Sequence, residues 1–419
     1  MSIDYKNFPE PKLDPIVNPR PKAGGGRPVI VAAQRTAIGK FQGSLSEVPA
    51  PELGAAVVRQ ILQNTGLSSE LIDEVIFGCV LAAGQGQNPT RQVVIKSGMD
   101  PRVSAFTINK VCASGLKSVS LASQAIRAGD QRAVLAGGME NMSRAPYLLE
   151  KARTGYRLGH GQMLDSMISD GLWDGKYDFH MGNTGELVAQ KYGLSREQQD
   201  EYAYQSHQKA LAAVAAGKFK DEIAPVQVPA GKGKFNTFEV DECPRADTSL
   251  EALGKLRPAF VKENGTVTAG NAPGVNDAAA ALLVMDEDFA REQGLTPLAR
   301  VLDSYAGGLD PAWVMLTPIP SVRGLLKRNP EWKLSDFACV EINEAFSVQA
   351  LAVIQELGLD PARVNVNGGA VALGHPIGCS GARILVTLIH ALRQRGGGRG
   401  LATLCLGGGN GLALAIETI

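Results

Sequence analysis

Short apolar runs alternate with stretches of helical periodicity along most of the chain. The apolar run over residues 28–33 predicts a first buried strand. Further strands are expected over residues 74–77, 132–136, 338–342 and 401–406, and helices over residues 53–62, 115–127, 347–357 and 382–394. Because strands alternate with helices, we expect an α/β fold whose mixed sheets are covered by helices.

A loop-rich stretch interrupts this alternation between residues 144 and 275. It contains aromatic-rich turns, a helix whose start is predicted by the capping-box pair Ser195 and Gln198, and a lysine- and glycine-rich loop over residues 231–234. Outside it, cysteine–glycine segments precede helices at residues 112–115 and 379–381, which favours two similar halves. We therefore expect an irregular N-terminal tail over residues 1–27, an N-terminal half over 28–143 and 276–297, an inserted loop domain over 144–275, and a C-terminal half over 298–419.

Composition and charge narrow the functional class. Lys plus Arg and Asp plus Glu each number 42, so the chain lacks the basic field that a nucleic-acid binder or a polybasic membrane protein needs. No apolar run approaches the roughly 18 to 20 residues of a membrane span, and the N-terminus has no secretory pattern. The six cysteines are scattered without a CxxC pair, which argues against a zinc ribbon and a disulfide framework. We expect a cytoplasmic enzyme without a metal.

Glycine is the residue in clear surplus. The chain has 48 glycines, whereas about 7% usage would give roughly 29. They fall in short clusters, where a backbone turns tightly or approaches another group closely. Reactive side chains beside such clusters are therefore the candidates for chemistry.

Cys112 directly precedes a predicted helix of small residues. The partial positive charge at a helix start favours a thiolate and would lower the pKa of this thiol. Small residues after it would let a substrate carbonyl come close. The alternative is a buried structural cysteine, because free cysteines are among the most buried residues.

His375 and Cys405 lie in two further glycine-rich segments. His375 stands between Gly374 and Pro376 at a strand-to-helix junction, a place suited to proton transfer or oxyanion donation. Cys405 ends a strand and is followed by glycines at 407–409, whose N–H groups could bind an oxyanion. A glycine-rich turn without chemistry is the alternative for Cys405.

For Asn343 and Cys379 a structural role is an alternative to a role in chemistry. Asn343 follows an apolar strand and could either cap the next helix or position a water or a polar substrate group. Cys379 is expected only to pack in the core.

These segments carry a resemblance to the thiolase family, which extends from about residue 28 to the C-terminus. The segments that carry it are residues 33–39, 84–89, 111–115, 136–140, 342–346 and 368–383, and Cys405 with its glycines. Within the family the chain most resembles acetyl-CoA acetyltransferases. The resemblance implies the thiolase fold, with two similar α/β halves and a loop-rich insertion, and a reversible Claisen condensation of two acetyl-CoA molecules with ping-pong kinetics.

The resemblance also implies a role for each candidate. Cys112 would be the nucleophile that takes the acyl group, and His375 would deprotonate or stabilise it. Cys405 would remove the α-proton of the second acetyl-CoA. Asn343 would hold a water that completes an oxyanion hole with His375, and the N–H groups of Cys112 and Gly407 would form the other hole.

The substrates implied are acetyl-CoA and other acyl-CoA thioesters, with no separate cofactor. The positions expected to contact them are Leu172, His180, Met181, Lys232, Phe260, Ala269 and Phe346. For Lys232 a solvated loop is an equal alternative. The stretch around residues 147–170 implies a homo-oligomer, as a dimer of dimers.

Three departures from the family pattern affect the expected chain length of the acyl group. Pro273 stands where a serine often contacts the pantetheine arm, Asn410 stands where short-chain enzymes commonly have methionine, and residues 313–318 lack the usual glycine. A 3-ketoacyl-CoA thiolase acting on longer chains is therefore one alternative function. An acyl-CoA-binding scaffold without turnover is an alternative of another class.

Overall fold

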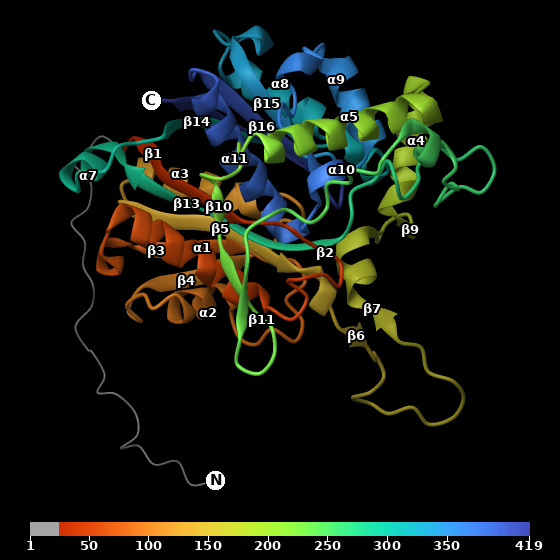
Figure 1. Ribbon diagram of the computed structural model, residues 1–419, viewed down its shortest axis with the longest axis horizontal. Coiled ribbons are helices and arrows are strands. Elements are labelled where there is room, and N and C mark those ends of the chain that lie inside the picture. The colour runs from red at the N-terminus through yellow and green to blue at the C-terminus, as the bar shows by residue number, and fades with distance from the viewer. Residues whose placement is uncertain (1–24) are drawn as a thin grey trace.

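An eleven-stranded mixed sheet runs through residues 25–419, the part of the chain that the computed structural model describes (Figure 1). Its strands follow the order β15-β16-β17-β14-β1-β13-β5-β3-β4, with β10 paired to β1 and β2 paired to β13. Their bounds are β1 (Pro28–Thr36), β2 (Gly39–Lys40), β3 (Glu74–Gly78), β4 (Ser104–Ile108), β5 (Ala133–Asn141), β10 (Ile223–Ala224), β13 (Asn276–Asp286), β14 (Ala299–Gly308), β15 (Phe337–Ile342), β16 (Arg399–Leu406) and β17 (Asn410–Thr418). Most of the predicted N-terminal tail, residues 1–24, lies outside the described residues.

The two parts of this sheet share one topology. In each part the first strand (β1 or β14) pairs antiparallel with the last (β13 or β17), and the last pairs antiparallel with an inner strand (β5 or β16). This inner strand pairs parallel with β3 or β15, and β4 extends only the N-terminal part. The parts meet at Val29 and Ile30 of β1, which pair with Arg300 and Ala299 of β14. The sheet therefore consists of two similar halves joined edge to edge.

Helices cover both faces of the sheet. The helices of the two halves are α1 (Ala50–Thr65), α2 (Pro89–Lys96), α3 (Ser114–Ala128), α7 (Glu287–Glu292), α8 (Pro318–Arg328), α9 (Ser347–Leu357), α10 (Ala370–Leu373) and α11 (Ile377–Gln394). Helix α11 contacts α3 and strands of both halves, whereas α1 packs on β1 and β13, and α8 packs on β14 and β17. Helices α3 and α11 are thus the central pair, and they share one hydrophobic core.

Glycines allow α3 and α11 to approach closely. A Cβ atom at Gly381 of α11 would lie 2.5 Å from the backbone nitrogen of Leu116, and one at Gly115 of α3 would lie 2.7 Å from that of Ala382. Real Cβ atoms do not approach other atoms this closely, so neither position has room for a side chain in this packing. Part of the glycine surplus therefore serves helix packing.

The stretch between residues 144 and 275 forms hairpins, a short π-helix (Met167–Leu172) and three α-helices. The hairpins are β6 (Tyr147–Leu148) with β7 (Leu164–Asp165), β8 (Trp173–Asp174) with β9 (Phe179–His180), and β11 (Val226–Pro229) with β12 (Phe235–Phe238); the helices are α4 (Met181–Tyr192), α5 (Arg196–Ala215) and α6 (Leu250–Gly254). The predicted capping box at the start of α5 is confirmed, with Ser195 and Gln198 bonded reciprocally.

This stretch is tied to the sheet by a buried ion cluster. The guanidinium of Arg35 on β1, which is fully buried, bonds Glu222 at 2.6 Å and Asp241 at 2.7 Å. Strand β10 also pairs with β1. Among residues 25–419, no helix is long and apolar enough to cross a membrane.

Candidate active site

One cavity of about 300 Å³ brings Cys112, His375 and Cys405 together. Cys112 comes from the turn before α3, His375 from the loop before α11, and Cys405 from the end of β16. Other predicted site residues that line it are Leu172, His180, Met181, Phe260, Ala269, Phe346 and Gly407. Lys232 does not line it, because it lies in the exposed turn between β11 and β12. Residues from both halves and from the insertion thus form one site.

Cys112 is held as a neutral thiol. The backbone N–H groups of Gly407 and of Cys112 itself point at the thiol, yet burial outweighs them and raises its pKa to about 12. The expectation of a lowered pKa is therefore wrong. Helix α3 begins only at Ser114, two residues after Cys112. The free-energy cost of desolvating a thiolate in this cavity therefore exceeds the stabilisation that the helix N-terminus gives the thiolate. A base must remove this proton before Cys112 can attack.

His375 is a neutral ring in a fixed loop. Its backbone N–H donates to Oδ1 of Asn276 at 2.8 Å, and its ring atom Nδ1 lies 2.6 Å from Oγ of Ser380. Burial, with a smaller contribution from the nearby Arg383 guanidinium, lowers the pKa of the imidazole to about 3. A neutral imidazole can accept a proton at one nitrogen and donate from the other.

Cys405 is the second buried thiol of the cavity. Burial raises its pKa far above the usual range, and the neighbouring Cys112 raises it further. The chain then turns through Gly408 and Gly409, at φ 82° and 79°, and a Cβ atom at Gly409 would lie 2.4 Å from the carbonyl oxygen of Leu309. This glycine turn leaves the N–H of Gly407 free to face Cys112.

Asn343 faces the ring of His375 and does not cap a helix. Helix α9 begins at Ser347, and its N-cap residue Phe346 makes no side-chain cap bond. Nδ2 of Asn343 lies 3.5 Å from both ring nitrogens of His375, so it lies against the ring and not along either lone pair. Oδ1 of Asn343 is buried and bonds no atom among residues 25–419. Asn343 does not itself line the cavity, so its contact with a water or a substrate group stays a prediction.

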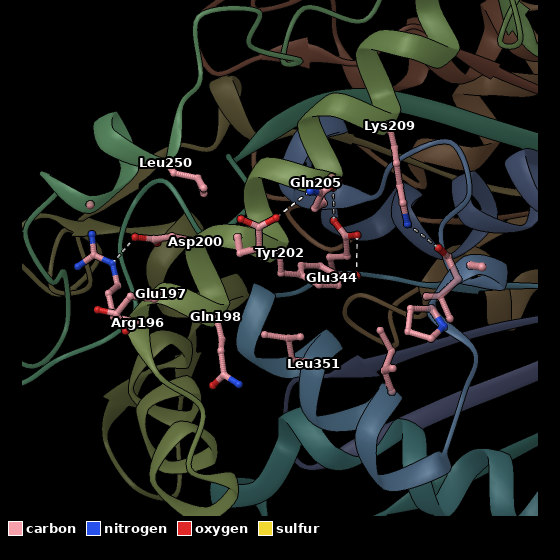
Figure 2. A pocket seen from close by; sticks show the side chains of 17 residues that line it. Arg196, Glu197, Gln198, Asp200, Tyr202, Gln205, Lys209, Leu250, Glu344 and Leu351 are labelled. Atoms are coloured by element: carbon pink, nitrogen blue, oxygen red, sulfur yellow. Dashed lines mark hydrogen bonds and ion pairs between the residues drawn. The ribbon is translucent and has the colours of Figure 1, made fainter.

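The neighbouring Glu344 anchors the loop after β15. Its carboxylate accepts hydrogen bonds from Tyr202 at 3.0 Å, Ser206 at 2.9 Å, Asn365 at 2.8 Å and the N–H of Val371 at 2.9 Å. Figure 2 shows Tyr202 and Glu344 in a second cavity of about 920 Å³. That cavity is larger, but no thiol or histidine lines it, so we assign the chemistry to the smaller one.

Comparison with known proteins gives the family. Residues 28–288 match the thiolase N-terminal domain, and residues 295–418 match the thiolase C-terminal domain. The chain belongs to the thiolase family. It is 56% identical over 388 residues to an acetyl-CoA acetyltransferase of Pseudomonas aeruginosa, covering 93% of this chain and 98% of that one. An Escherichia coli acetyl-CoA acetyltransferase is 54% identical over 392 residues, covering 93% and 99%.

A solved structure is similar as well. The crystal structure of the Bacillus anthracis acetyl-CoA acetyltransferase superposes with a TM-score of 0.92 at 43% identity, covering 94% of this chain and 99% of that one. The predicted thiolase fold is therefore confirmed.

Two cavity residues of this thiolase, Met142 and Ile377, had no expected role in the site. Val314 and Met315 also line the cavity, and they belong to the segment 313–318 that was expected to affect the acyl chain length. These cavity residues come from segments far apart in the sequence, so local pattern could not group them. Pro273 also lines the cavity, whereas the side chain of Asn410 turns toward the carbonyl oxygen of Gly408 at 3.5 Å.

Glu140 is a buried carboxyl beside the site. It accepts the N–H groups of Val80 at 3.0 Å, Leu81 at 3.1 Å and Gly378 at 2.9 Å, and so ties β5 to the start of α11. Burial raises its pKa to about 7. Within residues 25–419, no group of three His, Cys, Asp or Glu side chains is placed to hold a metal ion.

Proposed function

We propose that this thiolase is an acetyl-CoA C-acetyltransferase, which reversibly condenses two acetyl-CoA molecules to acetoacetyl-CoA and CoA. The observation that carries the proposal is the meeting of two thiols and a neutral imidazole in one cavity, in a chain whose close relatives bear that name. A simple acyl-CoA binder needs neither the second thiol nor His375.

The first half-reaction transfers the acetyl group to Cys112. Because burial raises the pKa of this thiol to about 12, it needs a base, and the neutral imidazole of His375 in the same cavity can serve. The thiolate attacks the thioester carbon, and the N–H groups of Cys112 and Gly407 stabilise the oxyanion. CoA then leaves as a thiol with the proton held by His375.

The second half-reaction forms the carbon–carbon bond. Because its raised pKa keeps Cys405 protonated, Cys405 first passes its proton to the neutral imidazole of His375 in the same cavity, and the resulting thiolate, a strong base, removes the α-proton of the second acetyl-CoA. The enolate oxygen is held by His375 and by a water on Asn343. The enolate carbon attacks the acetyl-Cys112 carbonyl, the thiolate of Cys112 leaves, and it takes its proton back from the imidazolium of His375, which returns to the neutral form. Two separate half-reactions give ping-pong kinetics.

CoA thioesters are the substrates, and the mechanism needs no other cofactor. The cavity wall is mostly apolar, and the ring of His180 stacks on Phe260 at 4.8 Å between centroids, which suits the pantetheine arm. The exposed Lys232 would meet the nucleotide phosphates only if CoA extends to the β11–β12 turn. That contact remains a prediction.

The small volume of the cavity favours an acetyl group as the acyl substrate over longer acyl chains. Its volume of about 300 Å³ must hold part of the pantetheine arm as well as the acyl group, and Val314 and Met315 occupy one wall. Thiolysis of acetoacetyl-CoA should therefore exceed thiolysis of 3-ketooctanoyl-CoA. A strong preference for the longer substrate would identify a 3-ketoacyl-CoA thiolase instead.

The acyl-enzyme is the direct test of turnover. Intact-mass measurement after mixing with acetyl-CoA should show one acetyl group on Cys112, and the adduct should be absent in Cys112→Ser. A native protein that forms no adduct would refute the proposed mechanism and favour a scaffold.

We further propose a cytoplasmic homo-oligomer built as a dimer of dimers. The β6–β7 hairpin projects from the body of the molecule, as Figure 1 shows, and exposes Tyr147, Tyr156, Leu158 and Met163. Exposed apolar clusters of this kind are typical of subunit contacts. Replacing residues 150–162 by a short polar turn should convert tetramers into dimers in light scattering. The cytoplasmic location is supported by six free thiols.

A further inference from the structure

The proton on the His375 ring decides what this histidine can do. A neutral imidazole carries one proton, and the nitrogen without it is the base. Nδ1 lies 2.6 Å from Oγ of Ser380, one turn into α11. Both residues are buried, with Ser380 at 0% exposure, so water does not compete for this contact.

The hydroxyl proton of Ser380 has its own acceptor. Oγ of Ser380 donates to the carbonyl oxygen of Pro376 at 2.9 Å, the local bond that a helical serine makes to the residue four positions earlier. With its single proton placed there, Oγ presents a lone pair to the imidazole. The short contact at Nδ1 is then an N–H donated by His375 to Ser380.

No other side chain among residues 25–419 competes for Nδ1. Asn343 lies equally far from both ring nitrogens and faces the ring. The Glu140 carboxylate accepts three backbone N–H groups and has no hydrogen bond to the His375 ring. The ring therefore has one close in-plane partner, and that partner is neutral.

We infer that Ser380 is a positioning residue that fixes His375 in the Nδ1–H tautomer and leaves the Nε2 lone pair for the proton of Cys112. This inference rests on the proposed function, in which His375 is the base of the acetyl-transfer step. The proton moves from Sγ of Cys112 to Nε2, while the Nδ1–H stays on Ser380, and Nε2 then gives it to the departing CoA thiolate.

A hydroxyl partner has a different effect from a carboxylate partner. A carboxylate at Nδ1 would stabilise the imidazolium and raise the pKa of the histidine, whereas Ser380 orients the ring without adding charge. The low pKa of about 3 at His375 agrees with this arrangement. The ring accepts the proton only transiently and returns to the neutral form.

Replacing Ser380 by alanine tests the role in acetyl transfer. The rate constant for acetylation of Cys112 should fall about 10- to 100-fold, part of what a general base contributes, with little change in KM for acetyl-CoA. Ser380→Thr, which keeps the hydroxyl, should recover most of the rate. Ser118→Ala is the matched control, because this buried serine of α3 bonds Gly115 and Gly137 carbonyl oxygens and not the site. Equal rates in Ser380→Ala and Ser118→Ala would overturn the inference.

Nitrogen-15 NMR of histidine-labelled protein reads the tautomer directly. The chain has five histidines, and the His375→Asn variant identifies the signal of this ring. In the native protein the proton should be on Nδ1, and in Ser380→Ala it should shift toward Nε2. A native protein with the proton on Nε2 would overturn the inference. Failure of the proposed function has a different signature, the absence of any acetyl group on native Cys112.

Discussion

Replacing Gly381 by alanine tests whether the close packing of α3 and α11 sets the geometry of the site. A Cβ atom at this position would lie 2.5 Å from the backbone nitrogen of Leu116 and 2.8 Å from its Cβ. Ordinary contacts between such atoms are about 3.5 to 4.0 Å, so the helices must separate by about 1 Å. The loops that carry Cys112 and His375 lead directly into these two helices. The separation would therefore displace the nucleophile from its base.

The expected losses in stability and activity differ in size. Overpacking costs about 1 to 3 kcal/mol, and alanine in place of a helical glycine returns about 1 kcal/mol, so the net loss of stability is about 0 to 2 kcal/mol. A misplacement of about 1 Å lowers a catalytic rate by about 100-fold, which is about 2.7 kcal/mol in the barrier. Activity should thus fall more than stability.

The measurement pairs kcat for thiolysis of acetoacetyl-CoA with urea unfolding at the same temperature. Gly254→Ala is the control, since a Cβ at this helical glycine of α6 meets nothing within 4 Å. It should leave kcat unchanged and should stabilise the protein by at most about 1 kcal/mol. If Gly381→Ala lost less than about threefold in kcat while unfolding as expected, helix spacing would not set the site.

Three further predictions concern single groups of the site. Because burial raises the pKa of Cys112 to about 12, the rate of its alkylation by iodoacetamide should rise about tenfold per pH unit between about pH 7 and 10. Mass spectrometry measures this rate, and a rate that levels off below about pH 9 would contradict the raised pKa. Burial raises the pKa of Glu140 to about 7 in the folded protein, so the proton that the unfolded chain releases near pH 4.5 is retained. The protonated Glu140 carboxyl adds up to about 3 kcal/mol to the free energy of unfolding below about pH 4.5, and this contribution is lost as the pH rises through 7. In urea unfolding, Glu140→Gln should lack this loss of stability between about pH 4.5 and 7. The same pH dependence in Glu140→Gln and the native protein would contradict the prediction. Asn343→Ala should slow acetoacetyl-CoA formation on the order of 100-fold but leave acetylation of Cys112 nearly unchanged, whereas equal losses in both assays would place Asn343 elsewhere in the mechanism.

The pattern of the sequence predicted the central elements well, and it failed at the first turn of α11. The strand and helix expected at 338–342 and 347–357 agree with β15 and α9 to within one residue. Helix α11 was expected from residue 382, but it begins at Ile377. After Ile377, its first turn consists of small residues and glycines, of which Gly378 packs against β5 and Gly381 against α3, and these carry no apolar periodicity.

The candidate site was predictable where glycine and a reactive side chain are neighbours in the sequence. Cys112, His375 and Cys405 stand beside such glycines, and the structure places all three in one cavity. The direction of the pKa of Cys112 was not predictable, because desolvation depends on atoms from distant segments. Glu140 was likewise missed as a functional group, since its partners are backbone N–H groups of two other loops.

The edge-to-edge joining of two similar halves has a consequence for how the enzyme becomes active. The nucleophile Cys112 belongs to the first half, whereas His375, Cys405 and Asn343 belong to the second. Each half pairs its own strands, yet neither half alone brings a base to the nucleophilic thiol of Cys112. During synthesis, the first half therefore emerges carrying an unactivated cysteine, and reactivity arises only when α11 docks against α3. The appearance of activity thus reports the final docking of the two halves and not the formation of their secondary structure.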